Sequence, residues 1–310
     1  MTRIAAVTGA TGFLGRRLVR ALADDGWRVR VLARRDPIDP LWRDVEPEVV
    51  PGDLADDAAL ARLAQDADVL VHAAALVKAP GRTDFEAVNR EGARRVAHAA
   101  AGTPHAVLVS SLAAREPGLS HYAASKRAAE DAMAEALGSR LTIARPPAIY
   151  GPGDREMLPV FQAAQTSPVL PVPSETARIG MIHVDDAARQ IAALAAGGEA
   201  GRTVALSDDR PEGHSWRDLM SAAARACGRA PRLAPVPRAL IQAIGITNDF
   251  RAMLGASPML TSGKARELLH PDWAIAPEER AVGLPAPIHA LEGGFEDTVA
   301  WYRRAGWMKH

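Results

Sequence analysis

The sequence predicts an α/β protein built on a doubly wound parallel sheet, and three observations carry that prediction. Short β-branched runs alternate with longer helical patterns through the first half of the chain. Those runs are apolar almost without interruption, which is typical of parallel strands covered by helices on both faces. A glycine-rich turn separates the first run from the first helix, where dinucleotide-binding βαβ units place such a turn.

The strands and helices can be assigned from this alternation. The predicted strands are Ile4–Thr8, Val29–Ala33, Glu48–Pro51, Val69–Ala73, Ala106–Ser110, Leu141–Ala144 and Thr203–Leu206. The predicted helices are Leu14–Asp25, Asn89–Ala101, Ala123–Leu137 and Val184–Ala196.

The rhythm breaks where Pro146, Pro147, Gly151, Pro152 and Gly153 crowd together. We therefore expect a Rossmann-type nucleotide-binding domain formed by residues 1–150 and 183–207. The remaining residues, 151–182 and 208–310, are expected to form a smaller, discontinuous C-terminal substrate lobe. Its apolar stretches Ala239–Ile246 and Met253–Leu260 are consistent with an uncharged organic substrate, although such stretches more often form core than pocket.

Composition excludes several classes of protein. The 310 residues include 37 Lys+Arg and 37 Asp+Glu, so the formal net charge is zero. That balance argues against nucleic acid or an anionic membrane as a partner. The single cysteine, Cys227, excludes an internal disulfide and a cysteine-based zinc cluster, and we expect no metal. No apolar run reaches the roughly 20 residues of a membrane span. The first residues lead directly into a strand pattern, so we expect a cytoplasmic enzyme.

The glycine-rich turn is the first candidate site. It reads Gly9-Ala10-Thr11-Gly12-Phe13-Leu14-Gly15, with a strand pattern before it and an amphipathic helix pattern after it. Glycines there permit a tight turn and bring the backbone close to a pyrophosphate at a helix N-terminus. We expect a dinucleotide to bind this turn, in contact with Gly9, Thr11, Gly12, Phe13, Leu14 and Gly15.

The residues after the second strand discriminate between cofactors. Arg34 lies 19 residues after Gly15, where an NAD site usually has an acidic residue, and Arg35 follows it. Two guanidiniums suit a 2′-phosphate, so we expect NADP(H), with NAD(H) as the alternative. Asp36 follows both arginines and is the weaker ribose candidate. Asp53, after the third strand, either contacts the adenine or serves as a turn residue.

Tyr122 and Lys126 are the candidate catalytic pair. They lie four residues apart and so share one face of a helix. An ammonium beside a phenol stabilises the phenolate, and such a tyrosine can exchange a proton with a carbinol oxygen during hydride transfer. Ser110 and Ser111 end a strand at the carboxyl edge of the sheet, where one of them could orient the substrate oxygen.

These motifs, in this order, resemble the extended short-chain dehydrogenase/reductase family, the NAD(P)-dependent epimerase/dehydratase group. The matching segments are TGATGFLG (Thr8–Gly15), GDL (Gly52–Leu54), HAAA (His72–Ala75), VNREG (Val88–Gly92), VSS (Val109–Ser111), YAASK (Tyr122–Lys126), ARPPAIYGPGD (Ala144–Asp154), IHVDDAA (Ile182–Ala188) and VAWYRRAGW (Val299–Trp307).

The resemblance implies roles for the matching residues. Tyr122 would be the general acid/base, and Lys126 would lower its pKa and hold the nicotinamide ribose. Ser111 would polarise the substrate oxygen, with Ser110 as the fallback. Cofactor contacts are implied for Gly9, Gly12, Gly15, Asp53, Leu54, Ala73, Ala74, Ala75, Tyr122, Lys126 and Pro146. Asn89 would support its helix, and a homodimer through the helices of Asn89 and Tyr122 is suggested.

Three departures bear on the substrate. Ser111 and Tyr122 are only 11 residues apart, Pro146-Pro147 stand where nucleotide-sugar enzymes often have an asparagine, and Ile179 stands where their diphosphate-binding arginine lies. The pattern is more similar to the dihydroflavonol-reductase-like and hydroxysteroid-dehydrogenase-like branch. We therefore expect an NADP(H)-dependent oxidoreductase acting on a carbonyl or alcohol of a small organic molecule. The alternatives are a redox-neutral nucleotide-sugar epimerase or dehydratase with tightly bound NAD, and a non-catalytic nucleotide-sensing or assembly protein.

Overall fold

The computed structural model describes residues 2–35, 37, 39–79, 81–253 and 260–309. Asp36 and most of the Met253–Leu260 stretch lie outside these residues. The chain divides into two compact units. The first comprises residues 1–146, 187–206 and 279–285, and the second comprises residues 147–186, 207–278 and 286–310.

The first unit is built on a parallel sheet of seven strands within the described residues. Their order is β10 (Thr203–Ala205), β6 (Leu141–Arg145), β5 (His105–Val109), β4 (Val69–His72), β1 (Ile4–Thr8), β2 (Arg28–Ala33) and β3 (Glu48–Pro51). In the central register, Val7 pairs with Val31 of β2 and with Val71 of β4. The chain order reverses between β1 and β4, and ligands of open α/β sheets bind at the carboxyl ends of the strands beside such a reversal.

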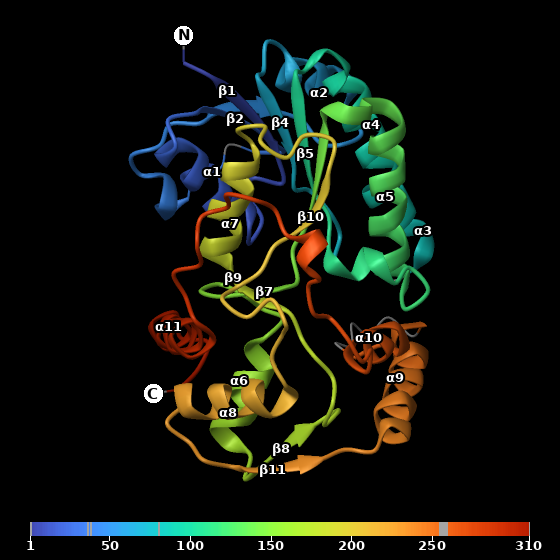
Figure 1. Cartoon of the computed structure of the whole chain (residues 1–310), viewed down its shortest axis with the longest axis vertical. Coiled ribbons are helices and arrows are strands. Elements are labelled where there is room, and N and C mark those ends of the chain that lie inside the picture. The colour runs from blue at the N-terminus through green and yellow to red at the C-terminus, as the bar shows by residue number, and fades with distance from the viewer. Residues whose placement is uncertain (1, 36, 38, 80, 254–259, 310) are drawn as a thin grey trace. The chain divides into compact units, whose positions relative to one another are not determined.

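Helices cover both faces of this sheet (Figure 1). On one side lie α1 (Gly15–Asp24) and the part of α7 (Val184–Leu194) that belongs to the first unit. On the other lie α2 (Asp57–Ala64), α4 (Gly92–Ala99) and α5 (His121–Leu137). Apolar residues of these three helices, such as Leu60, Val96 and Met133, share one buried cluster with inward side chains of the sheet. This apolar layer fixes α5, which carries the candidate catalytic pair.

The predicted doubly wound α/β fold is confirmed, and each predicted strand differs from the observed one by at most one residue at either end. Several helical segments differ more, among them two that cover the sheet. The prediction omitted α2, although its N-cap signal is present: the Asp56 carboxylate accepts a hydrogen bond from the Ala59 N–H at 2.9 Å. The predicted helix Asn89–Ala101 divides into a π-helical turn at Glu86–Glu91, α4, and a 3₁₀ turn at Ala100–Gly102.

The second unit has its own core. Its elements are β7 (Ala148–Tyr150), α6 (Leu158–Thr166), β8 (Val169–Val172), β9 (Met181–His183), α8 (Trp216–Ala226), β11 (Arg232–Pro235), α9 (Arg238–Met253), α10 (Ser262–Leu268) and α11 (Leu291–Arg304). Tyr150, Phe161, Phe295 and Tyr302 are fully buried and pack edge to face. Among the described helices, none is both long and apolar enough to span a bilayer.

Candidate active site

At two positions of the turn between β1 and α1, the backbone leaves room only for glycine. Gly9 has a φ of +75°, and a Cβ atom there would lie 2.5 Å from the backbone nitrogen of Ala74. A Cβ atom on Gly15 would lie 1.9 Å from the carbonyl oxygen of Gly9. The Gly12 N–H donates to that same carbonyl at 3.0 Å. The turn is therefore packed tightly against both the loop after β4 and the start of α1.

The N-terminus of α1 suits a bound anion. Leu14, its N-cap residue, makes no side-chain capping bond, and the first turn has no acidic residue. The positive end of the helix dipole therefore meets no acidic side chain of the described first turn. Thr11 and Gly12 are exposed, and Phe13 and Leu14 are half-buried. This arrangement fits the pyrophosphate of a dinucleotide.

The loop after β4 forms the opposite wall of the turn. The Ala73 N–H donates to the carbonyl of Thr8 at 3.2 Å, and the Ala74 N–H donates to the Thr8 hydroxyl at 3.4 Å. Ala73, Ala74 and Ala75 are all half-buried, with small side chains that leave the edge of the sheet accessible. His72 lies below them, its Nδ1 2.7 Å from the Thr8 hydroxyl, and burial lowers the pKa of this histidine to about 3. His72 is therefore a neutral, packed side chain.

Asn89 fixes this loop to α5. Its amide group donates to the carbonyl of Leu76 at 2.9 Å and accepts from the Leu76 N–H at 2.7 Å. The same Asn89 nitrogen donates to the Ser125 hydroxyl at 2.9 Å, and that hydroxyl donates to the carbonyl of Tyr122 at 2.7 Å. Asn89 thus sets the distance between the predicted cofactor wall and the helix turn that carries Tyr122.

Arg34 and Arg35 follow the carboxyl end of β2, and both are exposed. Within the described residues no hydrogen bond or ion pair is recorded for either guanidinium. Asp36, the weaker ribose candidate, lies outside the described residues. Both guanidiniums are therefore accessible to a ligand at the end of the second strand.

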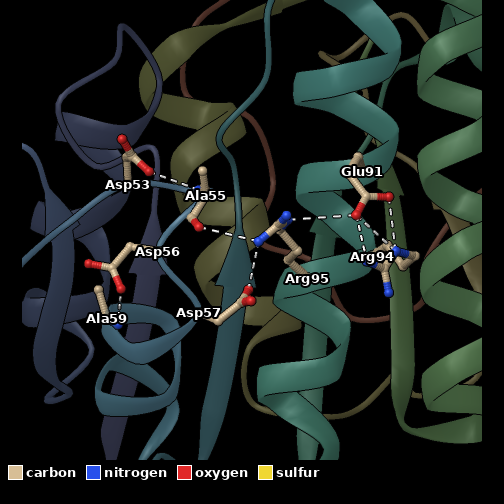
Figure 2. A network of polar contacts seen from close by, with 8 residues as sticks. All are labelled: Asp53, Ala55, Asp56, Asp57, Ala59, Glu91, Arg94 and Arg95. Atoms are coloured by element: carbon tan, nitrogen blue, oxygen red, sulfur yellow. Dashed lines mark hydrogen bonds and ion pairs between the residues drawn. The ribbon is translucent and has the colours of Figure 1, made fainter.

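Asp53 is held by its own turn: its carboxylate accepts from the Ala55 N–H at 2.8 Å. Hydrogen bonds from Arg95 of α4 hold this turn in place (Figure 2). Arg95 donates to the carbonyl of Ala55 at 3.2 Å and to the carboxylate of Asp57 at 3.0 Å. Glu91 receives the neighbouring guanidiniums of Arg94 and Arg95. Asp53 is thus a turn residue, which is one of the two roles predicted for it. Its exposed side chain can still contact an adenine.

Leu54 and Pro146 are the two other apolar residues expected at the cofactor. Leu54 packs towards α4, because a Cβ atom on Gly92 would lie 2.9 Å from its Cδ1 atom. Pro146 is buried after β6, and its carbonyl accepts from the Leu112 N–H at 2.8 Å. Both residues stabilise segments at the carboxyl edge of the sheet.

Tyr122 and Lys126 lie in the first turns of α5. Ser120 caps this helix, its hydroxyl accepting from the Ala123 N–H at 2.9 Å. Tyr122 is half-buried, with the Phe85 ring 6.2 Å away between centroids. Lys126 is 3% exposed, and its ammonium donates to the carbonyl of Val109 at 2.8 Å. Burial lowers the pKa of Lys126 to about 8.

The two candidate serines have different environments. Ser110 is buried, and its hydroxyl donates to the Glu130 carboxylate at 2.5 Å. Ser111 is half-buried, and its hydroxyl accepts from the Ala113 N–H at 3.2 Å, which leaves its own proton available. Ser111 is therefore the serine that can donate to a substrate oxygen, while Ser110 belongs to a packed polar network.

That network contains two residues that the sequence reasoning missed. Glu130 is 3% exposed and lies one helical turn after Lys126. Arg145 at the end of β6 donates to both of its carboxylate oxygens, at 2.8 and 2.6 Å. The Glu130 charge opposes the effect of burial and raises the pKa of Lys126. The sequence did contain a signal for Glu130: it stands four residues after Lys126, on the same face of the helix as Tyr122.

Replacing Glu130 with glutamine is expected to move the alkaline limb of the kcat profile to lower pH, by about half a unit or more. The charged form of Lys126 then loses the stabilising carboxylate of Glu130, while neutral His72 and cationic Arg145 remain. The pKa of Lys126 therefore falls, and its ammonium loses a proton at lower pH. Initial rates at saturating cofactor between pH 6 and pH 10 measure the limb. Glu135→Gln removes an exposed carboxylate from the same helix and is the matched control. An unchanged limb in Glu130→Gln would assign this glutamate to packing alone.

A histidine cluster lies in the second unit. His183, Asp185 and His289 bring potential ligand atoms within 4.8 Å of one another. The two imidazole rings are stacked, however, with centroids 3.8 Å apart and planes 25° apart. Ring nitrogens bind metals in the plane of the ring, so these lone pairs do not converge on one ion. Nδ1 of His289 instead lies 2.9 Å from the Asp186 carboxylate.

Ile179, at the position where nucleotide-sugar enzymes have a diphosphate-binding arginine, lies in the second unit. Ile179 is buried in the core of this unit, where its backbone pairs with His214. Arg178 beside it is exposed. A buried isoleucine cannot bind a diphosphate, which agrees with the departure noted in the sequence.

The chain matches the model of the NAD dependent epimerase/dehydratase family over residues 5–206. It is 53% identical over 307 residues to a ceramide reductase of Caulobacter vibrioides, covering 98% of this chain and 96% of that one. It is 32% identical to a (4-alkanoyl-5-oxo-2,5-dihydrofuran-3-yl)methyl phosphate reductase of Streptomyces griseus, covering 73% and 74% of the two chains. The Bordetella bronchiseptica enzyme WbmH, solved with NAD⁺, has a similar fold, with a TM-score of 0.75, 20% identity and coverage of 98% and 99%.

Proposed function

Since this chain belongs to the NAD-dependent epimerase/dehydratase family and is an NAD(P)-dependent oxidoreductase, we propose that it uses NADPH to reduce a ketone on a ceramide-type lipid. The observation that carries the reaction type is the position of half-buried Tyr122 one helical turn before buried Lys126, whose ammonium bonds the carbonyl of Val109 at the end of β5. The 53% identity to a ceramide reductase over nearly the whole chain supports this substrate class. Reduction of a ketone gives the secondary alcohol that a ceramide backbone contains.

In this proposal the bound nicotinamide supplies the hydride. Tyr122 gives its hydroxyl proton to the carbonyl oxygen as that oxygen becomes a carbinol. The Lys126 ammonium, held by the carbonyl of Val109, stabilises the phenolate that remains. Ser111 donates a hydrogen bond to the same substrate oxygen and orients it. The first unit would hold the cofactor, and the second unit would bind the lipid.

Two exposed arginines support the preference for NADPH. Replacing both Arg34 and Arg35 with alanine is expected to weaken NADPH binding by about ten- to a hundredfold, because a charge-assisted contact with the 2′-phosphate is lost. NADH affinity is expected to change by less than about twofold, since NADH has no such phosphate. Isothermal titration of both cofactors measures this difference.

Arg43→Ala is the charge control for that experiment, because Arg43 is exposed and follows β2 in the same region of the chain. An equal loss of affinity for both cofactors in the double variant would show that the arginines do not recognise the 2′-phosphate. The proposed preference for NADPH would then lose the support of these two residues.

The substrate is tested with the purified chain, NADPH and the ketone form of a ceramide in mixed micelles. Loss of absorbance at the nicotinamide wavelength and the mass of the lipid product report the reduction. The released nucleotide is identified in parallel by mass spectrometry after denaturation. Near-stoichiometric NAD together with no lipid reduction would overturn this proposal in favour of the redox-neutral epimerase or dehydratase.

A further inference from the structure

We propose that the exposed face of α9 docks this protein on an anionic lipid bilayer. Leu240, Ile244, Ile246 and Phe250 would enter the boundary between headgroups and acyl chains. The inference rests on the proposed function in one respect: a ceramide-type substrate carries long alkyl chains and resides in a bilayer, so its reductase has to meet it there.

The first observation is an apolar face that no described element covers. Leu240 is 52% exposed, Ile244 43%, Ile246 54% and Phe250 64%. At 100° per residue these side chains fall on one arc of α9, which they share with Ala239, Ala243, Thr247 and the exposed Arg251. Four large exposed apolar side chains on one helix exceed the scattered single ones that are normal on protein surfaces.

The opposite face of α9 already makes its packing contacts. It lies against α10 (Figure 1), where Asn248 donates to the carbonyl of Leu260 at 2.9 Å. Asp249 accepts from the Ser262 N–H at 3.0 Å, and Gly245 allows the backbone of Ser262 to come close. The fold of the second unit thus uses this packed face and leaves the apolar arc uncovered by the described elements.

The charged residues of α9 and α10 indicate which kind of partner fits this face. In residues 238–252 and 260–268 the exposed charged side chains are Arg238, Arg251, Lys264 and Arg266, all of them basic. The acidic residues of the same segments face inward: Asp249 bonds Ser262, and buried Glu267 bonds Lys264. Arg251 lies within the apolar arc, and an apolar arc that carries an exposed cation fits phosphate headgroups over acyl chains. The zero net charge of the whole chain conceals this local excess.

A second copy of the chain is the competing occupant, and it fits less well. A symmetric dimer would bring this face against itself, Arg251 included. Within the described part of the arc no acidic side chain is exposed to receive these cations. An anionic bilayer supplies the complementary charge that a second copy lacks.

The test is flotation of the full chain with vesicles. Vesicles of phosphatidylcholine with phosphatidylglycerol are compared with vesicles of phosphatidylcholine alone. We expect binding to the anionic vesicles that weakens in high salt. The double variant Ile246→Ser with Phe250→Ser is expected to bind about tenfold less, and Arg251→Glu is expected to lose binding to the anionic vesicles selectively. Val282→Ser with Ile288→Ser removes two exposed apolar side chains elsewhere, 83% and 69% exposed, and is the matched control.

The proposal is overturned if the parent chain does not float with anionic vesicles, or if the Ile246/Phe250 variant floats as the control does. Analytical ultracentrifugation completes the test, because a parent dimer that this variant dissociates, without vesicle binding, would assign the face to self-association. Flotation needs no turnover, so its outcome is independent of the substrate. NADPH-dependent reduction in detergent micelles by the same variants reports separately on the proposed function.

Discussion

Tyr122→Phe is expected to lower kcat by about 10²- to 10⁴-fold, the contribution usual for a positioned general acid. The substitution removes one hydroxyl and keeps the ring that lies 6.2 Å from Phe85. Lys126 keeps its hydrogen bond to the carbonyl of Val109, so the ammonium remains in place. Cofactor affinity is therefore expected to stay within about twofold, and the loss falls on the proton transfer. Steady-state kinetics and cofactor titration of the same preparation separate the two effects.

Tyr150→Phe is a control with the same chemical change. Tyr150 is fully buried in the second unit, and its hydroxyl has no hydrogen-bond partner among the described residues. Removing that hydroxyl deletes no polar contact, so turnover is expected to match that of the parent. If Tyr122→Phe retained more than about a tenth of the parent kcat, Tyr122 would not be the proton donor, and the proposed mechanism would be wrong.

The fold could be predicted because its signals are local. The central parallel strands, such as β1, β4 and β5, are short apolar runs buried on both faces, and each run ends at a turn or at a helix start that the neighbouring residues specify. The glycines at positions 9, 12 and 15 carry the turn in their spacing. The helix α2 was missed although Asp56 caps it, because Asp53, Asp56 and Asp57 together suggest a polar loop as readily as a helix start.

The polar partners within the site could not be predicted in the same way. Glu130 and Arg145 stand 15 residues apart on different elements, and only the packing of α5 against β6 makes them a pair. The choice between Ser110 and Ser111 also depends on that packing, because Glu130 binds the first of them. A sequence shows which residues can form hydrogen bonds, and tertiary structure decides which of them are already paired.

The exposed apolar face of α9 could not be predicted for the same reason. The stretch Ala239–Ile246 suits a core helix and a surface helix equally, because its apolar residues are spread around the whole helix. Gly245 and Ile241 face the packed side, while Leu240 and Ile244 are exposed. Their exposure could be recognised only after α10 was placed beside one face.

Gly15→Ala is expected to reduce cofactor affinity by more than about a hundredfold. The added Cβ atom would lie 1.9 Å from the carbonyl oxygen of Gly9, closer than the 3.0 Å below which real Cβ atoms essentially never approach another heavy atom. The Gly9 carbonyl belongs to the backbone and the added Cβ atom is fixed to the backbone of α1, so relief requires moving α1 away from the turn. That movement would also strain the hydrogen bond from the Gly12 N–H to the Gly9 carbonyl and displace the helix N-terminus at which we expect the pyrophosphate to bind.

The same clash is expected to lower the free energy of unfolding by about 1–3 kcal/mol, as overpacking usually does. Gly102→Ala is the matched control, since Gly102 has no heavy atom within 4 Å of a built Cβ and no positive φ. Chemical denaturation and cofactor titration distinguish the two effects. A Gly15→Ala variant that binds cofactor as well as Gly102→Ala would place the dinucleotide elsewhere, because no anion could remain bound to a helix terminus that this substitution displaces.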